Sequence, residues 1–348
     1  MIVDVHAHAF PSLAGPCGYA SEAEHMAFLQ THLAVRGPVV DRQGPSFDAE
    51  EDVNFRVGRF GRLEWSKGGE AGFTQWMPPS LQDMAAPPEL MIAQMDAVGV
   101  DKAVLYQGHV YGRLNDYLAD CARRYPERMV AVAQILEAYG DLPEQLDEVR
   151  RAAGTLGLKG LYYEIEHFRI VGSSAAVDDK RFDPLWEELT GLGMVLIWDI
   201  GRHLDPADHL KYLGRVRRIV ERFPKMVCIL SHFGSYIRDL ESKRIYNWDD
   251  ILSVAALDNV FLEILQVQYP STRTGDEYPF PMGQKTIEDA YRRLGAEKLV
   301  WGADMPALER ACTYRQSIDY VRVHCPFMTA REKDRVLGGN AAEMFGLN

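Results

Sequence analysis

Short apolar runs alternate with longer segments of helical periodicity along most of the chain. The first run begins at Ile2, and seven more follow after Pro88. Each run is rich in Val, Ile and Leu and has the length of a strand. The strands that these runs predict are one that begins at Ile2, then Lys102–Tyr106, Arg128–Ile135, Leu158–Glu164, Met194–Asp199, Met226–Ser231, Val260–Leu265 and Lys298–Trp301.

Strands without a polar face are typical of a parallel sheet that helices cover on both sides. Helical patterns stand between them, at Glu89–Val98 with Gly99 as its stop, Asn115–Tyr125, Glu144–Ala153, near Pro184, His209–Phe223 and, as a closing helix, Arg331–Phe345. Eight strands in strict alternation with helices predict an α/β fold, a (β/α)8 TIM barrel over residues 1–348 as a single domain. A doubly wound sheet is the alternative, but it would need a glycine-rich turn after the first strand, which the sequence lacks.

The segment between the first two predicted strands, residues 11–88, breaks this rhythm. It is rich in Gly, Pro and charged residues, and its one alternating patch, Val53–Trp65, predicts a small hairpin. A structureless loop of this length is uncommon in a compact domain, so we expect an inserted lobe or lid. It contains five arginines that are candidates for contact with an anionic substrate or a neighbouring subunit: Arg36, Arg42, Arg56, Arg59 and Arg62.

Composition narrows the class of partner. The chain has 38 basic and 50 acidic residues and a net charge of −12, which argues against nucleic acid and anionic membranes as partners. Apolar runs of membrane-spanning length and a signal-peptide layout are both missing from the sequence. Five scattered cysteines without a Cys-x-x-Cys pair indicate reduced thiols. We therefore expect a cytoplasmic protein that acts on a small molecule.

Two histidines, His6 and His8, close the first predicted strand. Residues i and i+2 of a strand share a face, so the two imidazoles can hold one metal ion. The alternative is one surface histidine and one hydrogen-bonded core histidine. In a barrel the chemistry gathers at the carboxyl ends of the strands.

Two further strand ends carry candidate groups. Asp304 follows the eighth strand and can bind a divalent ion or accept a proton, although an aspartate before Met-Pro can also be a turn residue. His232 follows the sixth strand and can act as an acid, a base or a carbonyl-polarising group, or be a histidine satisfied by backbone. The occurrence of both with His6 and His8 at strand ends favours a catalytic site.

The sequences HAHAF at the first strand, GLKG at the fourth, SHFG at the sixth and WGADMP at the eighth resemble the amidohydrolase superfamily. The resemblance is closest to its amidohydrolase-2 branch, which includes aminocarboxymuconate-semialdehyde decarboxylase and resorcylate-type decarboxylases. It implies one divalent ion, Zn²⁺ or Mn²⁺, held by His6, His8 and Asp304, with His232 acting on the substrate. It also implies a cytoplasmic homodimer.

The fifth strand departs from this pattern. Where the family has a metal-binding histidine, this chain has Trp198 followed by Asp199. Either Asp199 or His203 replaces the missing ligand, or the ion has fewer ligands, or the enzyme works without metal.

Three functions remain open. The first is a hydrolase of a small cyclic or aromatic carboxylate-bearing substrate, in which metal-activated water attacks, Asp304 helps to deprotonate it, and His232 stabilises charge on the substrate oxygen. The second is a non-oxidative decarboxylase of an aromatic or muconate-like acid. The third is a non-catalytic barrel that binds a small molecule. Candidate substrate contacts near the strand ends are Tyr163, Trp198, Arg202 and Arg244.

Overall fold

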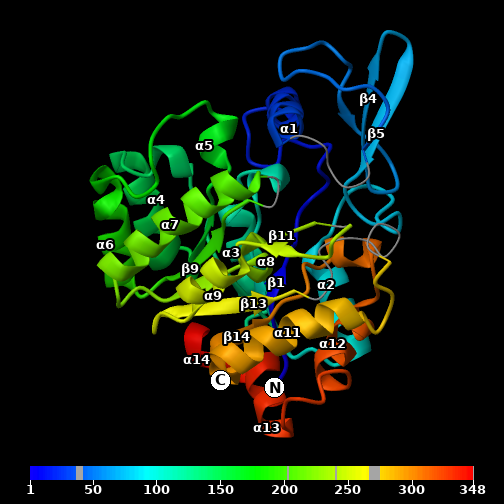
Figure 1. The fold of residues 1–348 in the computed structure, drawn as a ribbon. Coiled ribbons are helices and arrows are strands. Elements are labelled where there is room, and N and C mark those ends of the chain that lie inside the picture. The colour runs from blue at the N-terminus through cyan, green and yellow to red at the C-terminus, as the bar shows by residue number, and fades with distance from the viewer. Residues whose placement is uncertain (37–41, 202–203, 240, 266–274, 348) are drawn as a thin grey trace.

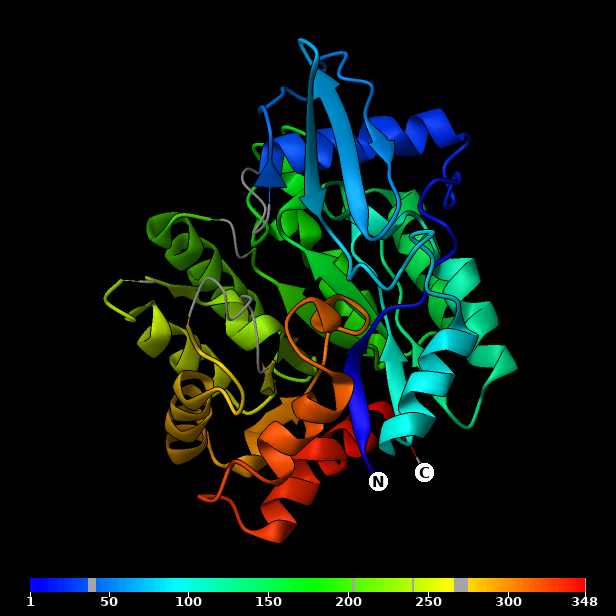
Figure 2. The same cartoon turned by 90° about the vertical axis from the view of Figure 1, so that its right-hand side faces the viewer.

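The computed structural model describes residues 1–36, 42–201, 204–239, 241–265 and 275–347. Arg202 and His203 therefore lie outside the described residues. The eight predicted strands are all present and form a (β/α)8 barrel (Figures 1 and 2). The barrel strands are β1 (Val3–Ala7), β6 (Lys102–Leu105), β7 (Met129–Ala131), β8 (Gly160–Glu164), β9 (Val195–Asp199), β10 (Cys228–Leu230), β13 (Val260–Ile264) and β14 (Leu299–Trp301).

The strands pair in parallel in two arcs, β1-β6-β7 and β14-β13-β10-β9-β8. Two single bridges join the arcs, Ala7 with Met305 and Ala133 with Leu161. At the first junction the His8 N–H donates to the carbonyl of Met305 at 2.8 Å. The first and last barrel strands are thus side by side, which brings residues about 300 positions apart to one place in the barrel.

Side chains alternate along each strand between the barrel interior and the helix layer. Val5, Tyr162 and Ile197 belong to the cluster that fills the barrel. Their strand neighbours, such as Leu161 and Leu196, pack with the surrounding helices in the main core. These helices are α2 (Pro88–Val98), α3 (Asn115–Arg124), α4 (Pro143–Gly154), α6 (Asp183–Leu192), α7 (Pro206–Arg222), α9 (Trp248–Ala255), α11 (Pro281–Leu294), α12 (Tyr314–Arg322), α13 (Ala330–Asp334) and α14 (Asn340–Phe345).

Several helix ends follow from local sequence signals. Gly99 ends α2 in the left-handed conformation, as predicted. Asp205 caps α7 by accepting hydrogen bonds from two backbone N–H groups. The predicted closing helix is present as α13 and α14, joined by a π-helical turn over Arg335–Gly339.

The lobe, residues 11–36 and 42–87, lies over the carboxyl ends of the barrel strands, at the opposite end from the N-terminus (Figure 1). It forms helix α1 (Glu22–Arg36) and a four-stranded antiparallel sheet in the order β2-β5-β4-β3. The sheet strands are β2 (Arg42–Gln43), β3 (Arg56–Val57), β4 (Arg62–Lys67) and β5 (Glu70–Gln75).

The prediction for the lobe was right in part. The hairpin expected at Val53–Trp65 is present as the pairing of β3 with β4, although the longer hairpin is β4 with β5. The sequence analysis predicted no helix in this segment, whereas residues 22–36 form α1. The buried face of α1 has helical spacing, but polar residues carry most of it, so its apolar periodicity is weak. The buried residues are His25, Leu29, His32, Leu33 and Arg36.

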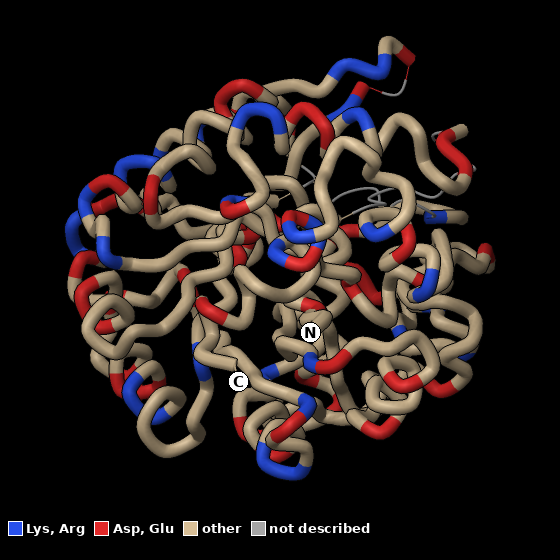
Figure 3. Tube along the Cα trace, turned by 90° about the horizontal axis from the view of Figure 1, so that it is seen from below, with Lys and Arg blue, Asp and Glu red and all other residues tan. Residues whose placement is uncertain are grey.

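Lys and Arg are interspersed with Asp and Glu over the surface, as Figure 3 shows from below. Ion pairs link neighbouring helices, such as Arg151 of α4 with Asp116 of α3 at 2.8 Å. Among the described residues, every helix is too short or too polar to cross a membrane.

Candidate active site

His6, His8 and Asp304 meet where β1 and β14 end. The Asp304 Oδ1 lies 3.5 Å from His6 Nε2 and 3.1 Å from His8 Nε2. One ligand atom from each residue lies within 4.8 Å of the other two, and all three residues are buried. Two imidazoles and a carboxylate are a donor set that suits a divalent transition metal ion.

The remaining nitrogen of each histidine is held by a second layer of groups. His6 Nδ1–H donates to Glu263 Oε1 at 2.7 Å, and His8 Nδ1–H donates to the carbonyl of Tyr106 at 2.6 Å. Metal-binding histidines are typically oriented in this way, because the second hydrogen bond fixes the tautomer and leaves Nε2 for the metal. The residues present therefore fit the ion that the sequence predicts.

Glycine at position 302 is required for this arrangement. A Cβ atom there would lie 2.1 Å from Glu263 Oε1 and 2.7 Å from the Cβ of His6. Asp304 itself has a φ of 61°, a left-handed conformation that is costly outside glycine and frequent at functional sites.

The electrostatics of the three residues are coupled. Burial lowers the pKa of His8. Burial would raise the pKa of Asp304, but the charge of His6 and the contact with His8 Nε2 hold it well below its usual range. Burial opposes the charged form of His6, yet Glu263 and Asp304 raise its pKa. Asp304 is therefore an ionised acceptor at neutral pH.

His232 lies beside this group, with its ring centroid 4.7 Å from that of His6. It begins α8 (His232–Ser235), whose four residues all have positive φ values, between 54° and 67°. Its backbone N–H donates to Glu263 Oε2 at 2.6 Å, so Glu263 contacts both His6 and His232. Ser231 Oγ lies 2.8 Å from His232 Nδ1.

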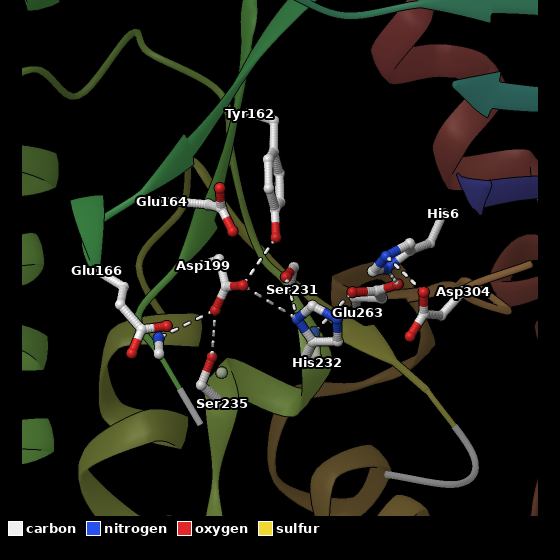
Figure 4. A network of polar contacts seen from close by, with 12 residues as sticks. His6, Tyr162, Glu164, Glu166, Asp199, Ser231, His232, Ser235, Glu263 and Asp304 are labelled. Atoms are coloured by element: carbon white, nitrogen blue, oxygen red, sulfur yellow. Dashed lines mark hydrogen bonds and ion pairs between the residues drawn. The ribbon is translucent and has the colours of Figure 1, made fainter. Parts of the chain in front are cut away.

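Asp199 lies on the other side of His232 from His6 and Asp304 (Figure 4). Its Oδ2 accepts a hydrogen bond from the Tyr162 hydroxyl at 2.8 Å, and its Oδ1 accepts one from Ser235 at 3.1 Å. Within the described residues, the metal-compatible group at β1 and β14 contains His6, His8 and Asp304 but not Asp199. Asp199 thus contacts the His232 turn instead of replacing the missing ligand.

Two of the predicted substrate contacts lie elsewhere. Trp198 and Tyr163 are fully buried in the helix-facing core, where Trp198 packs 5.4 Å from Trp186 and 5.1 Å from Tyr163. Strand alternation explains this, because their neighbours Asp199 and Tyr162 point into the barrel. Trp198 and Tyr163 therefore do not face the site and are not placed to contact a substrate.

Arg244 lies in the segment that follows β10 and α8. It is exposed on the hairpin of β11 (Ile237–Arg238) and β12 (Ile245–Tyr246), with its guanidinium 5.8 Å from the Tyr246 ring. The two remaining candidates, Arg202 and His203, fall outside the described residues.

The sequence analysis assigned no role to Glu263, Tyr162 or Ser235, although Glu263 stands in the seventh predicted strand and Tyr162 in the fourth. For Tyr162 the signal was available, since it is two residues from Glu164 and shares its inward face. The partners of Glu263 could not be predicted, because they depend on which strands are neighbours.

The sequence model of the protein family described as amidohydrolase matches residues 3–347 of this chain. The chain belongs to the amidohydrolase family. This result confirms the resemblance seen in the sequence. The comparison with curated proteins gave no match.

Solved structures share the fold of this amidohydrolase. A probable 2-pyrone-4,6-dicarboxylic acid hydrolase from Acinetobacter baumannii, with citric acid bound, is 15% identical, with a TM-score of 0.61 over 99% of both chains. A 4-oxalomesaconate hydratase from Rhodopseudomonas palustris is 13% identical, with a TM-score of 0.57 over 100% of this chain and 96% of that one. A 5-carboxyvanillate decarboxylase from Novosphingobium aromaticivorans, complexed with manganese, is 17% identical, with a TM-score of 0.50 over 74% and 79% of the two chains.

Proposed function

We propose that this protein is a metal-dependent hydrolase of a small cyclic or aromatic substrate that carries a carboxylate. The observation that carries the proposal is the orientation of His6 and His8. Their Nδ1 atoms are held by Glu263 and by the Tyr106 carbonyl, and their Nε2 atoms face Asp304. Zn²⁺ or Mn²⁺ held there would supply Lewis-acid polarisation of a substrate oxygen and lower the pKa of water.

The residues around the metal group have separate roles in this proposal. Asp304 is ionised and accepts a proton from the attacking water. His232 is adjacent to His6, at 4.7 Å between ring centroids, where its imidazole can stabilise charge that develops on the substrate oxygen. Glu263 orients both histidines through one carboxylate.

The lobe supports a substrate with a carboxylate. Two buried N–H donors, His32 Nδ1 and Trp76 Nε1, find no hydrogen-bond partner among the described residues. Beside them, Arg36 Nε makes no hydrogen bond but forms an ion pair with Glu166 Oε2 at 3.5 Å. Arg36, His32 and Trp76 lie together, since Arg36 Nη1 is 3.2 Å from His32 Nε2 and the Arg36 guanidinium is 5.5 Å from the Trp76 ring. Buried donors without acceptors are costly, and an anion would satisfy them.

This donor cluster is linked to the metal group through Tyr111. The Tyr111 ring packs 4.6 Å from that of His8. The charges of Asp304 and Arg36 both act on the Tyr111 hydroxyl, whose pKa burial raises. A substrate could therefore present its reactive carbon to His6, His8 and Asp304 and its carboxylate to Arg36.

The test is an assay of the purified, metal-loaded protein against two panels. One contains carboxylated lactones such as 2-pyrone-4,6-dicarboxylate, followed by loss of ring absorbance. The other contains hydroxybenzoates such as 5-carboxyvanillate, followed by release of CO₂. We expect hydrolysis without CO₂, lost in His6→Ala and retained in the exposed control Glu127→Gln. Release of CO₂ would assign the carboxy-lyase alternative instead, and absence of turnover on both panels would contradict the enzymatic proposal.

The proposal also covers the oligomeric state of the protein and its location in the cell. We expect a cytoplasmic homodimer, which size-exclusion chromatography with light scattering and cell fractionation can test.

A further inference from the structure

A second buried group of histidines and carboxylates lies at the ends of three other barrel strands. His109 lies in the turn after β6, Glu137 follows β7, and His167 follows β8 in α5 (His167–Ile170). Their side chains are at most 2% exposed. Glu137 Oε2 lies 2.5 Å from His109 Nε2 and 3.3 Å from His167 Nδ1. One ligand atom from each residue lies within 4.8 Å of the others.

The hydrogen bonds place lone pairs face to face in this group. The backbone N–H of Ala138 donates to His167 Nδ1 at 3.2 Å, so this nitrogen has no proton of its own. It nevertheless faces the Glu137 Oε2 atom, which also carries lone pairs. A proton on Glu137 or a metal ion between the two atoms would relieve this contact. A metal ion at Nδ1 would take the place of the Ala138 hydrogen bond, because an imidazole nitrogen has one lone pair.

A second carboxyl group adjoins these three residues. Glu164 is also buried, and its backbone N–H donates to Glu137 Oε1 at 3.0 Å. Its Oε2 accepts hydrogen bonds from the His109 N–H at 2.6 Å and from Gln134 at 3.1 Å. Two carboxyl groups thus adjoin two imidazoles. The charge of Arg113 also acts on both imidazoles, although Arg113 is not part of this set of hydrogen bonds.

Burial shifts the pKa of each of these four side chains in the direction that favours its neutral form. It raises the pKa of Glu137 and of Glu164 to about 7, and lowers that of His109 and of His167 to about 4. Both imidazoles are therefore neutral at pH 7, which is the form that binds metal.

We propose that His109, Glu137 and His167 form a second divalent metal site, separate from His6, His8 and Asp304. Two imidazole nitrogens and one carboxylate oxygen are a donor set that suits Zn²⁺. Glu164 acts as the outer group that fixes Glu137 and the His109 backbone. The site lies beneath α1, since Phe28 of α1 packs 5.9 Å from the His109 ring.

Metal counting tests this proposal. The protein is stripped with a chelator, dialysed against Zn²⁺, and analysed for zinc per chain by mass spectrometry. We expect about two equivalents in the wild type and about one in either His8→Ala or His167→Ala, because each variant removes a ligand of a different site. The double variant should bind close to none, and His324→Ala, which removes a histidine bonded to the Tyr278 hydroxyl, should keep about two.

A further variant covers the case in which His167→Ala fails to fold. Glu137→Gln preserves the size of the side chain and should abolish the Zn²⁺-induced rise in Tm that remains in a His8→Ala background. The proposal is overturned if the wild type binds one equivalent of zinc that is lost in His8→Ala but kept in His167→Ala and in Glu137→Gln. In that case the group holds a shared proton instead of a metal ion. Two equivalents that persist in Glu137→Gln would also overturn the proposal.

Discussion

At the scale of single residues, Glu263 connects the two parts of the candidate site. One carboxylate oxygen accepts from His6 Nδ1–H and the other from the backbone N–H of His232. Glu263 is fully buried in β13, so both bonds lie where water does not compete. The same carboxylate thus sets the direction of a metal ligand and the position of the group that acts on substrate.

Replacement of this carboxylate should weaken metal binding without removing a ligand. In Glu263→Gln we expect metal affinity to fall by about 10- to 100-fold, since outer-shell partners of histidine ligands have effects of this size. Competition with a chromogenic chelator measures the affinity. Glu127→Gln, at an exposed site, is the matched control. Equal affinity in the two variants would contradict the role of Glu263.

The residue scale also separates what sequence can predict from what it cannot. His6, His8, His232 and Asp304 were predicted because each follows a recognisable strand, and the structure brings them together. Trp198 and Tyr163 were misjudged, because strand ends were counted without the inward or outward alternation of the side chains.

At the scale of elements, helix α7 holds the turn that carries His232. His209 of α7 donates its Nε2–H to the carbonyl of Gly234 at 2.9 Å, and its Nδ1 lies 3.3 Å from the Asn247 amide. A neutral imidazole satisfies both contacts, with Asn247 as donor. Protonation would place a second N–H against that amide.

This contact predicts a pH dependence of stability. Burial lowers the pKa of His209, against the opposing effects of the Gly234 hydrogen bond and the charges of Asp199 and Asp250. The folded state therefore binds the proton less readily than the unfolded chain, and the free energy of unfolding falls as pH drops below about 6.5. Each pH unit costs at most about 1.4 kcal/mol for one group.

Urea unfolding at pH 7.5 and 5.5 measures this effect. The loss on acidification should be smaller in His209→Gln than in the wild type, whereas His324→Gln should match the wild type. An unchanged loss in His209→Gln would show that another group titrates.

Helix α1 brings the lobe into the site through Arg36. In Arg36→Met we expect kcat/KM to fall by about 10- to 100-fold, mainly through a higher KM, because a charge-assisted hydrogen bond contributes roughly 1.5–3 kcal/mol. Steady-state kinetics on the substrate identified by the panels measures this. Arg59→Met, an exposed arginine of the same lobe, is the control. A fall in kcat alone would place Arg36 outside substrate binding.

Helix α1 was not predicted from the sequence, because its buried face is largely polar. Its buried face consists largely of His25, His32 and Arg36, so a helix that covers a polar site lacks the apolar stripe that normally reveals a helix. The barrel strands have apolar contacts on both faces and were all predicted.

At the scale of the whole molecule, barrel closure explains why distant motifs form one site. The parallel bridge of Ala7 with Met305 brings the first and last strands together, and with them His8 and Asp304, whose side chains lie 3.1 Å apart. The number and order of strands were predictable from the alternation of patterns. The lobe was predictable only as an insertion, because its packing on the mouth depends on contacts between distant residues.

Anomalous diffraction from crystals grown with Zn²⁺ tests the central claim most directly, since it locates the ion instead of counting it. The account predicts a peak at about 2.0–2.2 Å from His6 Nε2, His8 Nε2 and an Asp304 carboxylate oxygen. Absence of a peak at these three atoms in crystals of enzyme that is fully active would contradict it.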